Sequence, residues 1–261
     1  MSANFRKTLF KFYYRAEALI APGLRNAQFA YRDVLKSMLM SETRWLDIGC
    51  GRRLFPEWMP GADAEEILLR TRVEAIFGLD PDLASLRDNH FVKYRVVGDA
   101  GSLPFANSSF DLLTANMVVE HIAEPHALLS EIHRVLKPNG MFLFHTPNAN
   151  SYATLMARVV PESVKVNLIA FFEGRKEEDV FRTFYRVNTP ARVEELSRTA
   201  GFQVLELRRV ESTAQAVMLG PLVIPELLWI RLLRLASLRN LRSNLIVVLQ
   251  KPAKVALNPS Q

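Results

Sequence analysis

The residues that could do chemistry begin with WLDIGCG, 45–51, where an apolar run ends in Asp47 and a Gly49-Cys50-Gly51 turn follows. Glycines are needed in such a turn because the backbone approaches a ligand closely and a Cβ would stand in the way. Turns of this type bind nucleotides in several folds, NAD-binding domains included. Alone, the turn predicts a nucleotide-like ligand without naming it.

Two later acids narrow the choice of ligand. The sequence DPD, 80–82, follows a predicted strand at 73–79, and the Asp80 carboxylate can accept hydrogen bonds from both hydroxyls of a ribose. Asp99 ends another predicted strand and can accept a hydrogen bond from an adenine amino group. The glycine turn and the two acids together indicate a site for an adenosine-containing cofactor.

These residues need a framework, and from Arg44 onward short β-rich runs alternate with helical stretches. Such alternation is typical of an α/β fold with a doubly wound parallel sheet. The predicted strands are 44–48, 73–79, 94–97, 110–115, 140–146, 202–210 and 244–250, and the predicted helices between them are 83–89, 125–136 and 189–200.

Three more stretches follow in order: LPFANSSFDLL at 103–113, NMVVEHIAEP at 116–125 and EIHRVLKPNGMFLFHTPN at 131–148. With the glycine turn they resemble the class I S-adenosylmethionine-dependent methyltransferases, especially quinone-precursor and cell-surface glycan methyltransferases. The resemblance covers about residues 44–148, and residues 185–202 show a weaker similarity to the same family. It implies a Rossmann-like, seven-stranded, mostly parallel sheet with an antiparallel last strand, and S-adenosylmethionine bound at the carboxyl ends of the early strands.

The same resemblance implies roles by position. The implied cofactor-binding residues are Asp47, Gly49, Cys50 and Gly51 along the methionine part, Asp80 and Pro81 at the ribose, Asp99 and Ala100 at the adenine, and Asn116 and Met117 on the methionyl side. Cys50 is expected to serve there as a small side chain and not as a nucleophile.

Two features depart from the family pattern. Arg53 stands where a third glycine is common, and Gly51 and Asp80 lie 29 positions apart, against about 20 in such units. The extra segment, 54–66, is expected to loop out near the carboxylate of the cofactor, where Arg52 or Arg53 would pair with it.

Methyl transfer from a sulfonium needs in-line alignment above all, and a hydroxyl acceptor also gains from a general base. His121, after the fourth predicted strand, is the first candidate for that base, and His145, at the end of the fifth, is the second. His121 is equally well explained as a residue that orients the following helix. No His, Cys, Asp or Glu set has metal-ligand spacing, so no metal is expected.

Segment 148–188 lies outside the shared motifs and is expected to meet the substrate. It contains predicted helices at 152–160 and 164–172, followed by a polar stretch that serves either as a lid or as an ordinary charged connector. The candidate substrate contacts in that stretch are Arg182, Tyr185 and Asn188.

Segment 216–240 is strongly apolar, but its longest nearly uncharged run has 15 residues, fewer than the roughly 20 that a membrane-spanning helix needs. From Pro225 onward, Arg231 and Arg234 form a narrow polar stripe. That pattern fits a helix lying in a membrane interface. It fits equally well a helix over a substrate pocket or against a second subunit.

The net charge of +6 is unevenly spread: residues 1–40 hold seven Lys/Arg against two acids, and 225–261 hold six against one. Basic ends favour anionic lipid or nucleic acid, and solvated helix surface explains them equally well. The sequence contains no motif typical of nucleic-acid-binding domains. The expected partner is therefore a small or lipid-linked substrate, with no nucleic acid. Peripheral contact of 216–240 with a membrane surface stays open, and the sequence does not indicate an oligomeric state.

A single cysteine excludes an intramolecular disulfide, and the first twenty residues lack the apolar core of a signal peptide. We therefore expect a cytoplasmic protein, located at the inner face of the membrane if 216–240 contacts lipid.

The expected organisation is a helical extension at 1–43, a methyltransferase domain at 44–252 with inserts at 148–188 and 214–240, and a polar tail at 253–261. The expected activity is methylation of a small or lipid-linked acceptor, first of all at oxygen. C- or N-methylation and a non-catalytic S-adenosylmethionine-binding module stay open as alternatives. An NAD-dependent oxidoreductase is disfavoured because no Tyr-x-x-x-Lys pair follows the turn.

Overall fold

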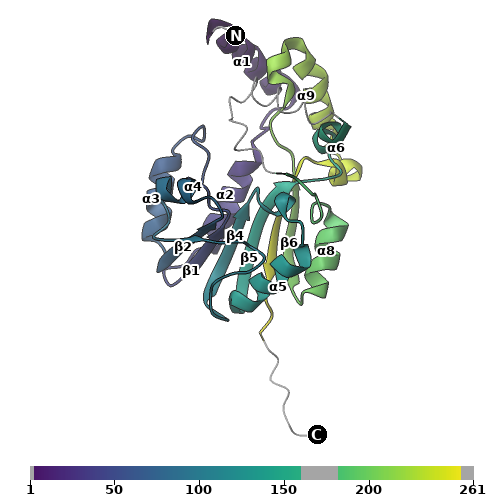
Figure 1. Ribbon diagram of the computed structural model, residues 1–261. Helices are drawn as coiled ribbons and strands as arrows, with labels where there is room; N and C mark the ends of the chain where they lie inside the picture. The colour runs from purple at the N-terminus through teal and green to yellow at the C-terminus, as the bar shows by residue number, and fades with distance from the viewer. Residues whose placement is uncertain (1–2, 160–181, 254–261) are drawn as a thin grey trace. The chain divides into compact units, whose positions relative to one another are not determined.

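The computed structural model describes residues 3–159 and 182–253 of the chain. Within these residues seven strands form one sheet in the order β3-β2-β1-β4-β5-β7-β6 (Figure 1). The strands are β1 (Arg44–Ile48), β2 (Ala75–Asp80), β3 (Tyr94–Val97), β4 (Phe110–Asn116), β5 (Leu136–Pro147), β6 (Gln203–Val210) and β7 (Asn244–Gln250).

The first five strands are parallel neighbours. β1 lies between β2 and β4, so that Leu46 is opposite both Phe77 and Leu113. β7 runs antiparallel to β5, because Lys251 N donates to Gly140 O at 2.9 Å and Asn148 N, at the other end of β5, donates to Ser243 O at 2.8 Å. The expected doubly wound, mostly parallel α/β sheet with an antiparallel last strand is confirmed.

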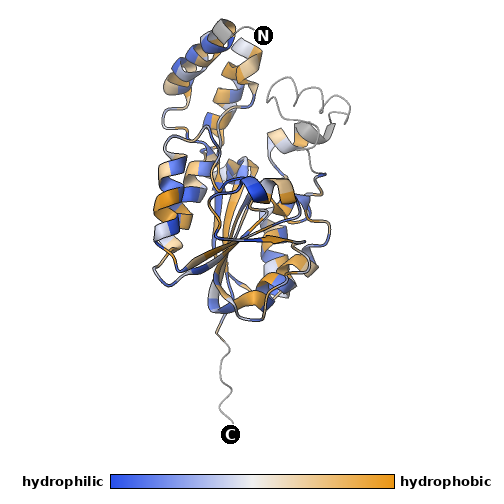
Figure 2. Ribbon diagram, turned by 60° about the vertical axis from the view of Figure 1, so that its left-hand side comes forward, coloured by the Kyte–Doolittle hydropathy of each residue, from blue (hydrophilic) through white to orange (hydrophobic). Residues whose placement is uncertain are grey.

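The centre of the sheet is apolar on both faces, as parallel sheets covered by helices usually are. In β1 the side chains of Trp45, Leu46 and Ile48 are fully buried, and β7 is buried from Asn244 to Leu249. Figure 2 shows this concentration of apolar residues along the central strands.

Helices flank the strands. The α-helices are α1 (Ala3–Ile20), α2 (Ala27–Met38), α3 (Ala62–Thr71), α4 (Leu83–Asp88), α5 (Pro125–Val135), α6 (Tyr152–Val159), α8 (Pro190–Thr199) and α9 (Val223–Leu232), and the short 3₁₀ helices are η1 (Val119–His121), η3 (Ala216–Leu222) and η4 (Ala236–Leu241). α4 packs on β2 and β3, and α5 packs on α8. Figure 1 shows α3 and α4 beside the β2 end of the sheet and α5 and α8 beside the β6 end.

The structure corrects the expected loop at 54–66, because α3 begins inside it at Ala62. Ala62 and Leu69, two turns apart, are buried, while Asp63 and Glu65 in the first turn suit the positive end of the helix dipole. Only two buried positions mark this helix, so its apolar periodicity is too weak to stand out in the sequence.

Smaller corrections concern element ends. β2 begins at Ala75 instead of 73, and β5 begins at Leu136, directly after α5, instead of at 140. Early entry into β5 is possible because Leu136 pairs with Phe110 across a bulge. The helix expected at 164–172 lies outside the described residues.

The chain divides into two compact units, each discontinuous in sequence. The first contains residues 1–30, 147–183 and 209–245, and the second contains 31–146, 184–208 and 246–261. The domain limits expected at 43/44 and 252/253 stay predictions.

In the first unit, α9 begins at Val223, one half-turn before the expected start at Pro225. Val223, Leu227 and Ile230 are buried against Tyr13 of α1. The arginines of the expected polar stripe are partly engaged: Arg231 donates to Ile20 O at 3.2 Å and Arg234 to Pro22 O at 3.0 Å, at the carboxyl end of α1. Among the described helices, none combines the length and apolar character needed to span a bilayer.

Candidate active site

The glycine turn after β1 has the left-handed backbone that its sequence predicts, with φ of +64° at Gly49 and +49° at Gly51. A Cβ placed on Gly49 would lie 2.5 Å from Val118 Cγ2, whereas a Cβ on Gly51 would meet no atom within 4 Å. Gly49 is therefore required by packing. Gly51 faces open space that a ligand can occupy.

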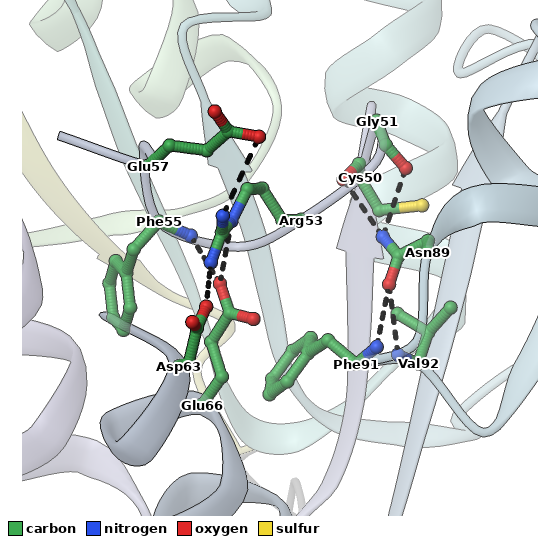
Figure 3. Close-up of polar contacts among 10 residues, drawn as sticks. All are labelled: Cys50, Gly51, Arg53, Phe55, Glu57, Asp63, Glu66, Asn89, Phe91 and Val92. Carbon is green, nitrogen blue, oxygen red and sulfur yellow. Dashed lines mark hydrogen bonds and ion pairs between the residues drawn. The ribbon is translucent and has the colours of Figure 1, made fainter. Parts of the chain in front are cut away.

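A residue that the sequence analysis passed over holds this turn in place. The side-chain amide of Asn89 donates to Cys50 O at 3.1 Å and to Gly51 O at 2.9 Å. Its carbonyl oxygen accepts from Phe91 N at 2.9 Å and Val92 N at 3.1 Å (Figure 3). Asn89 is fully buried, and its only signal in the sequence is a short polar residue at the end of a helix.

Asp80, at the end of β2, also holds the glycine turn in place by accepting a hydrogen bond from it. Its Oδ2 accepts from Gly51 N at 2.8 Å, and its Oδ1 accepts from Asp82 N at 2.9 Å. Each carboxylate oxygen can accept a second hydrogen bond, so both remain able to receive a hydroxyl donor. The neighbouring Pro81 is exposed, and Asp82 caps the amino end of α4.

Asp47 lies beneath the turn and is buried with 3% of its surface exposed. Trp45 Nε1 donates to Thr114 Oγ1 at 2.6 Å, and Thr114 Oγ1 donates to Asp47 Oδ1 at 2.6 Å. Burial is the main cause that raises the pKa of Asp47 to about 7; the Thr114 hydrogen bond lowers this pKa, and the nearby carboxylates of Asp80 and Glu66 raise it. Burial therefore favours the protonated form of this carboxyl group.

Cys50 points away from solvent into the sheet. Gly78 of β2 leaves room for it: a Cβ on Gly78 would lie 2.7 Å from the Cys50 sulfur. Burial raises the pKa of the Cys50 thiol well above its usual value. Burial therefore favours the neutral thiol, and the expectation that Cys50 is no nucleophile stays a prediction.

The end of β3 joins the site through its backbone, because Gly98 N donates to Asp80 O at 3.3 Å. Asp99 is exposed, and its Oδ1 accepts from Gly101 N at 2.6 Å. Ala100 follows at the edge of the core. Asp99 and Ala100 thus stand at the same edge of the sheet as Asp80.

The end of β4 contributes Asn116 and Met117. Met117 has a φ of +59°, an unusual value for a residue with a side chain, and its N–H donates to His145 O at 2.8 Å. Its side chain is 39% exposed. Strained backbone of this kind often marks a ligand site.

His145 is 2% exposed, and its Nδ1 lies 2.9 Å from Asn116 Oδ1. Its ring stacks on Tyr31 with 5.8 Å between the ring centroids. These contacts favour a role for His145 in orienting Asn116 over direct proton transfer with an acceptor.

His121 ends η1 and is half-buried beside Glu120, whose side chain is 2% exposed. Thr146 Oγ1 donates to Glu120 Oε2 at 2.9 Å, and Asn188 Nδ2 donates to Thr146 Oγ1 at 2.5 Å. Burial raises the pKa of Glu120, while the adjacent His121 lowers it. Asn188 thus reaches η1 through Thr146 and is itself fully buried.

Tyr185 approaches the same loop with its backbone: its N–H and that of Phe184 donate to Glu120 O at 3.2 and 2.7 Å. Tyr185 has a φ of +53° and is half-buried. Arg182 is exposed and belongs to the first unit. The structure therefore gathers His121, Tyr185 and Asn188 around Glu120.

Arg53 occupies the position of the missing glycine and faces acids of its own unit. It pairs with Asp63, and its guanidinium lies 3.8 Å from Glu57 and 3.7 Å from Glu66 (Figure 3). Arg53, Arg52, Arg70 and His90 line a pocket of about 520 Å³. Because three carboxylates surround Arg53, the exposed Arg52 is the better candidate to pair with a cofactor carboxylate.

Comparison with known proteins gives the site a context. A family model described as a methyltransferase domain matches residues 14–207. The ubiquinone biosynthesis O-methyltransferase of Pseudomonas syringae pv. tomato is 30% identical over 164 residues, 62% of this chain and 65% of that enzyme. The enzyme of the same name from Ralstonia nicotianae is 28% identical over 170 residues, 64% of this chain and 66% of that enzyme. The chain spans a little under two thirds of the length of these curated relatives.

Solved structures share the fold at low identity. An S-adenosylmethionine-dependent methyltransferase from Methanosarcina mazei has a TM-score of 0.55 at 18% identity, covering 85% of this chain and 98% of its own. The [4+2]-cyclase SpnF has a TM-score of 0.53 at 19% identity, covering 86% of this chain and 81% of its own. The expected class I fold is confirmed by these likenesses.

The two turn glycines provide a matched pair of substitutions. Both Gly49→Ala and Gly51→Ala force a side chain into left-handed backbone, at a cost of about 1–2 kcal/mol. Gly49→Ala should lose clearly more free energy of unfolding in urea, because its Cβ also strikes Val118. Equal losses for the two variants would show that Val118 moves aside freely.

The raised pKa of Asp47 predicts a pH-dependent stability. A raised folded-state pKa favours the protonated form, so its contribution is complete below about pH 4 and is lost as pH rises through about 7. Urea unfolding between pH 4 and 8.5 should show the wild type losing about 3–5 kcal/mol relative to Asp47→Asn. Asp82→Asn is the control, because the pKa of that carboxylate is lowered by Ser85; parallel curves for wild type and Asp47→Asn would contradict the argument.

Proposed function

Because the chain belongs to the methyltransferase domain family, we propose that it binds S-adenosylmethionine and transfers the methyl group to a hydroxyl oxygen of a small or lipid-linked acceptor. One observation carries the proposal. The hydrogen bond from Gly51 N to Asp80 Oδ2 joins the glycine turn to the strand-end acid beside open space.

The residues present suit this cofactor. The space beside Gly51 is open, because a Cβ there would meet no atom within 4 Å. Each carboxylate oxygen of Asp80 can still accept a hydrogen bond from a ribose hydroxyl, and the exposed Asp99 can accept one from an adenine amino group. Asn116 and Met117 stand at the end of the adjoining strand β4 for the methionyl part. The bound cofactor supplies an electrophilic methyl group on a sulfonium, and the residues of the chain orient it and exclude water.

His121 is the proposed general base for a hydroxyl acceptor. It lies directly after buried Glu120, whose position is set by Thr146 and by the backbone of Phe184 and Tyr185. Glu120 and its partners would fix the position of His121, so that its imidazole could accept a proton from the acceptor hydroxyl. Tyr185 and Asn188 belong to the same loop cluster and are proposed to border the acceptor. Arg182, in the polar stretch next to them in sequence, stays a proposed acceptor contact.

Two observations bear on the acceptor. The relatives named as ubiquinone biosynthesis O-methyltransferases support oxygen as the methylated atom. The cyclase among the structural neighbours shows that this fold also serves other reactions, so the reaction requires its own test.

Calorimetric titration tests the cofactor. The purified chain should bind S-adenosylmethionine and bind neither NAD nor NADP. Asp80→Asn should weaken this binding by about 1–3 kcal/mol, because one acceptor oxygen of the ribose site is lost. Asp82→Asn, a matched change two residues away that caps α4 instead, should retain wild-type affinity; unchanged affinity of Asp80→Asn would remove Asp80 from the site.

Turnover with hydroxylated aromatic acceptors tests the base. His121→Asn should lower kcat by about 10²-fold or more and flatten the acidic limb of the pH–rate profile, with cofactor affinity unchanged. His133→Asn, on α5 with its ring against Phe202, is the control. An unaltered pH profile in His121→Asn would assign His121 to orienting the loop instead.

A further inference from the structure

The first unit contains a pocket of about 670 Å³ that is lined by α6, η3 and α9. Its lining includes Tyr152, Ala216, Leu219, Glu226 and Trp229, and we call it the Glu226 pocket. All of its lining residues belong to this one unit. Its volume lies within the range of about 300–1,000 Å³ that is usual for small-molecule sites.

Most of the lining of the Glu226 pocket is apolar. The side chain of Leu219 is 51% exposed, and Ala153, Ala216 and Trp229 are half-buried. A ligand that covers these groups removes apolar surface from water, which favours binding in proportion to the area covered. The pocket therefore suits a ligand with an apolar body.

One carboxyl group interrupts this apolar lining. Glu226 Oε1 accepts from the Tyr152 hydroxyl at 2.5 Å and from Gln215 N at 2.8 Å. Glu226 Oε2 accepts from Ala216 N at 2.7 Å. Because each carboxylate oxygen can accept two hydrogen bonds, Oε1 is fully used and Oε2 keeps one acceptor position.

The three groups that donate to Glu226 are uncharged: one phenol and two backbone N–H groups. Burial, together with the hydrogen bond to Glu226 and its charge, raises the pKa of Tyr152 well above its usual value, so the phenol keeps its proton. Within the described part of the chain, no Lys or Arg forms an ion pair with Glu226. The pocket thus contains a carboxylate that has hydrogen-bond donors but no cation.

A ligand that covers the pocket withdraws water from this carboxylate. Loss of hydration is costly for a charged group unless the ligand supplies both a hydrogen bond and a compensating charge. A neutral alcohol can donate to Oε2 but leaves the charge uncompensated, and an anionic ligand adds a like charge. A protonated amine supplies both, through a charge-assisted hydrogen bond to Oε2.

Two aromatic side chains line the same pocket. Tyr152 is joined to Glu226 by its hydroxyl, and Trp229 follows Glu226 by three residues, which places both α9 residues on one side of the helix. The face of an aromatic ring attracts an ammonium group that lies within about 6 Å of the ring centre. These rings can therefore contact both the cationic end and the apolar body of an amine.

We infer that the Glu226 pocket binds a protonated amine with an apolar body, whose ammonium group donates to Glu226 Oε2 and whose body lies against Leu219 and Trp229. The residues proposed to hold the cofactor and to act as the base all lie in the second unit. Amine binding therefore goes beyond the proposed function and does not depend on it.

Calorimetric titration of the full chain with three probes tests for this amine site. Phenylbutylamine, phenylbutanol and phenylbutanoate share a phenylalkyl body and differ in their polar end, which is cationic, neutral and anionic, respectively, at neutral pH. Phenylbutylamine should bind about tenfold more tightly than phenylbutanol, because only the amine compensates the charge of Glu226. Phenylbutanoate should not bind.

A matched pair of acid substitutions locates the site. Glu226→Gln removes the charge and keeps an acceptor oxygen, so it should abolish the preference for phenylbutylamine over phenylbutanol. Glu211→Gln removes an acid of the same unit that pairs with Arg242 outside the pocket, and it should keep the wild-type preference.

A matched pair of leucine substitutions tests the apolar wall at exposed positions, where folding is not at stake. Leu219→Lys places a cation in the pocket and should weaken phenylbutylamine binding by about tenfold. Leu228 is 50% exposed and lies two residues after Glu226, on the other side of α9. Leu228→Lys should therefore bind the amine like the wild type.

Urea unfolding and S-adenosylmethionine titration of every variant separate loss of amine binding from loss of folding. A chain that binds phenylbutylamine but not S-adenosylmethionine would contradict the proposed function and leave the amine site in place. Three results would overturn the amine site: no phenylbutylamine binding by the folded wild type, equal affinities for phenylbutylamine and phenylbutanol, and an unchanged amine preference in Glu226→Gln.

Discussion

The glycine turn after β1 is held by buried polar side chains, and the rest of the site depends on this restraint. Left-handed backbone at Gly49 and Gly51 prevents regular pairing, so the turn's backbone groups need other partners. Asp80 accepts from Gly51 N, and Asn89 donates to Cys50 O and Gly51 O. Two side chains from the β2–α4 region thus fix the geometry of a turn that belongs to another strand.

Two buried carboxyl groups repeat one arrangement in the second unit. Asp47 in β1 accepts from Thr114 in β4, and Glu120 in η1 accepts from Thr146 in β5. Burial raises the pKa of each carboxyl group, and in each pair the threonine hydroxyl opposes the shift. The first pair joins two central strands beneath the glycine turn, and the second joins β5 to η1 at the carboxyl edge of the sheet.

The two units differ in their net charge, in their exposed apolar side chains and in the proposed site residues they contain. The residues proposed to hold the cofactor and the base lie in the second unit, together with most of the parallel sheet. The first unit carries the excess of positive charge and the exposed leucines of α9. Segment 216–240, which contains η3 and α9, also lies outside the part of the chain that the family model matches. The excess positive charge and the exposed leucines of α9 are thus separate from the residues proposed to bind the cofactor.

The sequence by itself predicted the strands of the sheet and the positions of the proposed cofactor residues along the chain. The strands at 44–48, 94–97 and 244–250 were predicted with their observed limits, because strong apolar runs bounded by turn residues depend on local chemistry alone. The glycine turn and Asp80 were identified for the same reason. Only the tertiary structure revealed Asn89, whose partners Cys50 and Gly51 lie 39 and 38 residues away. The tertiary structure also revealed the three acids around Arg53, which the folded loop brings together, and α3, whose two buried positions give too weak an apolar pattern. It also turned Arg231 and Arg234 toward carbonyl groups at the end of α1, since a helix pattern shows which residues share a face but not which neighbour that face will meet.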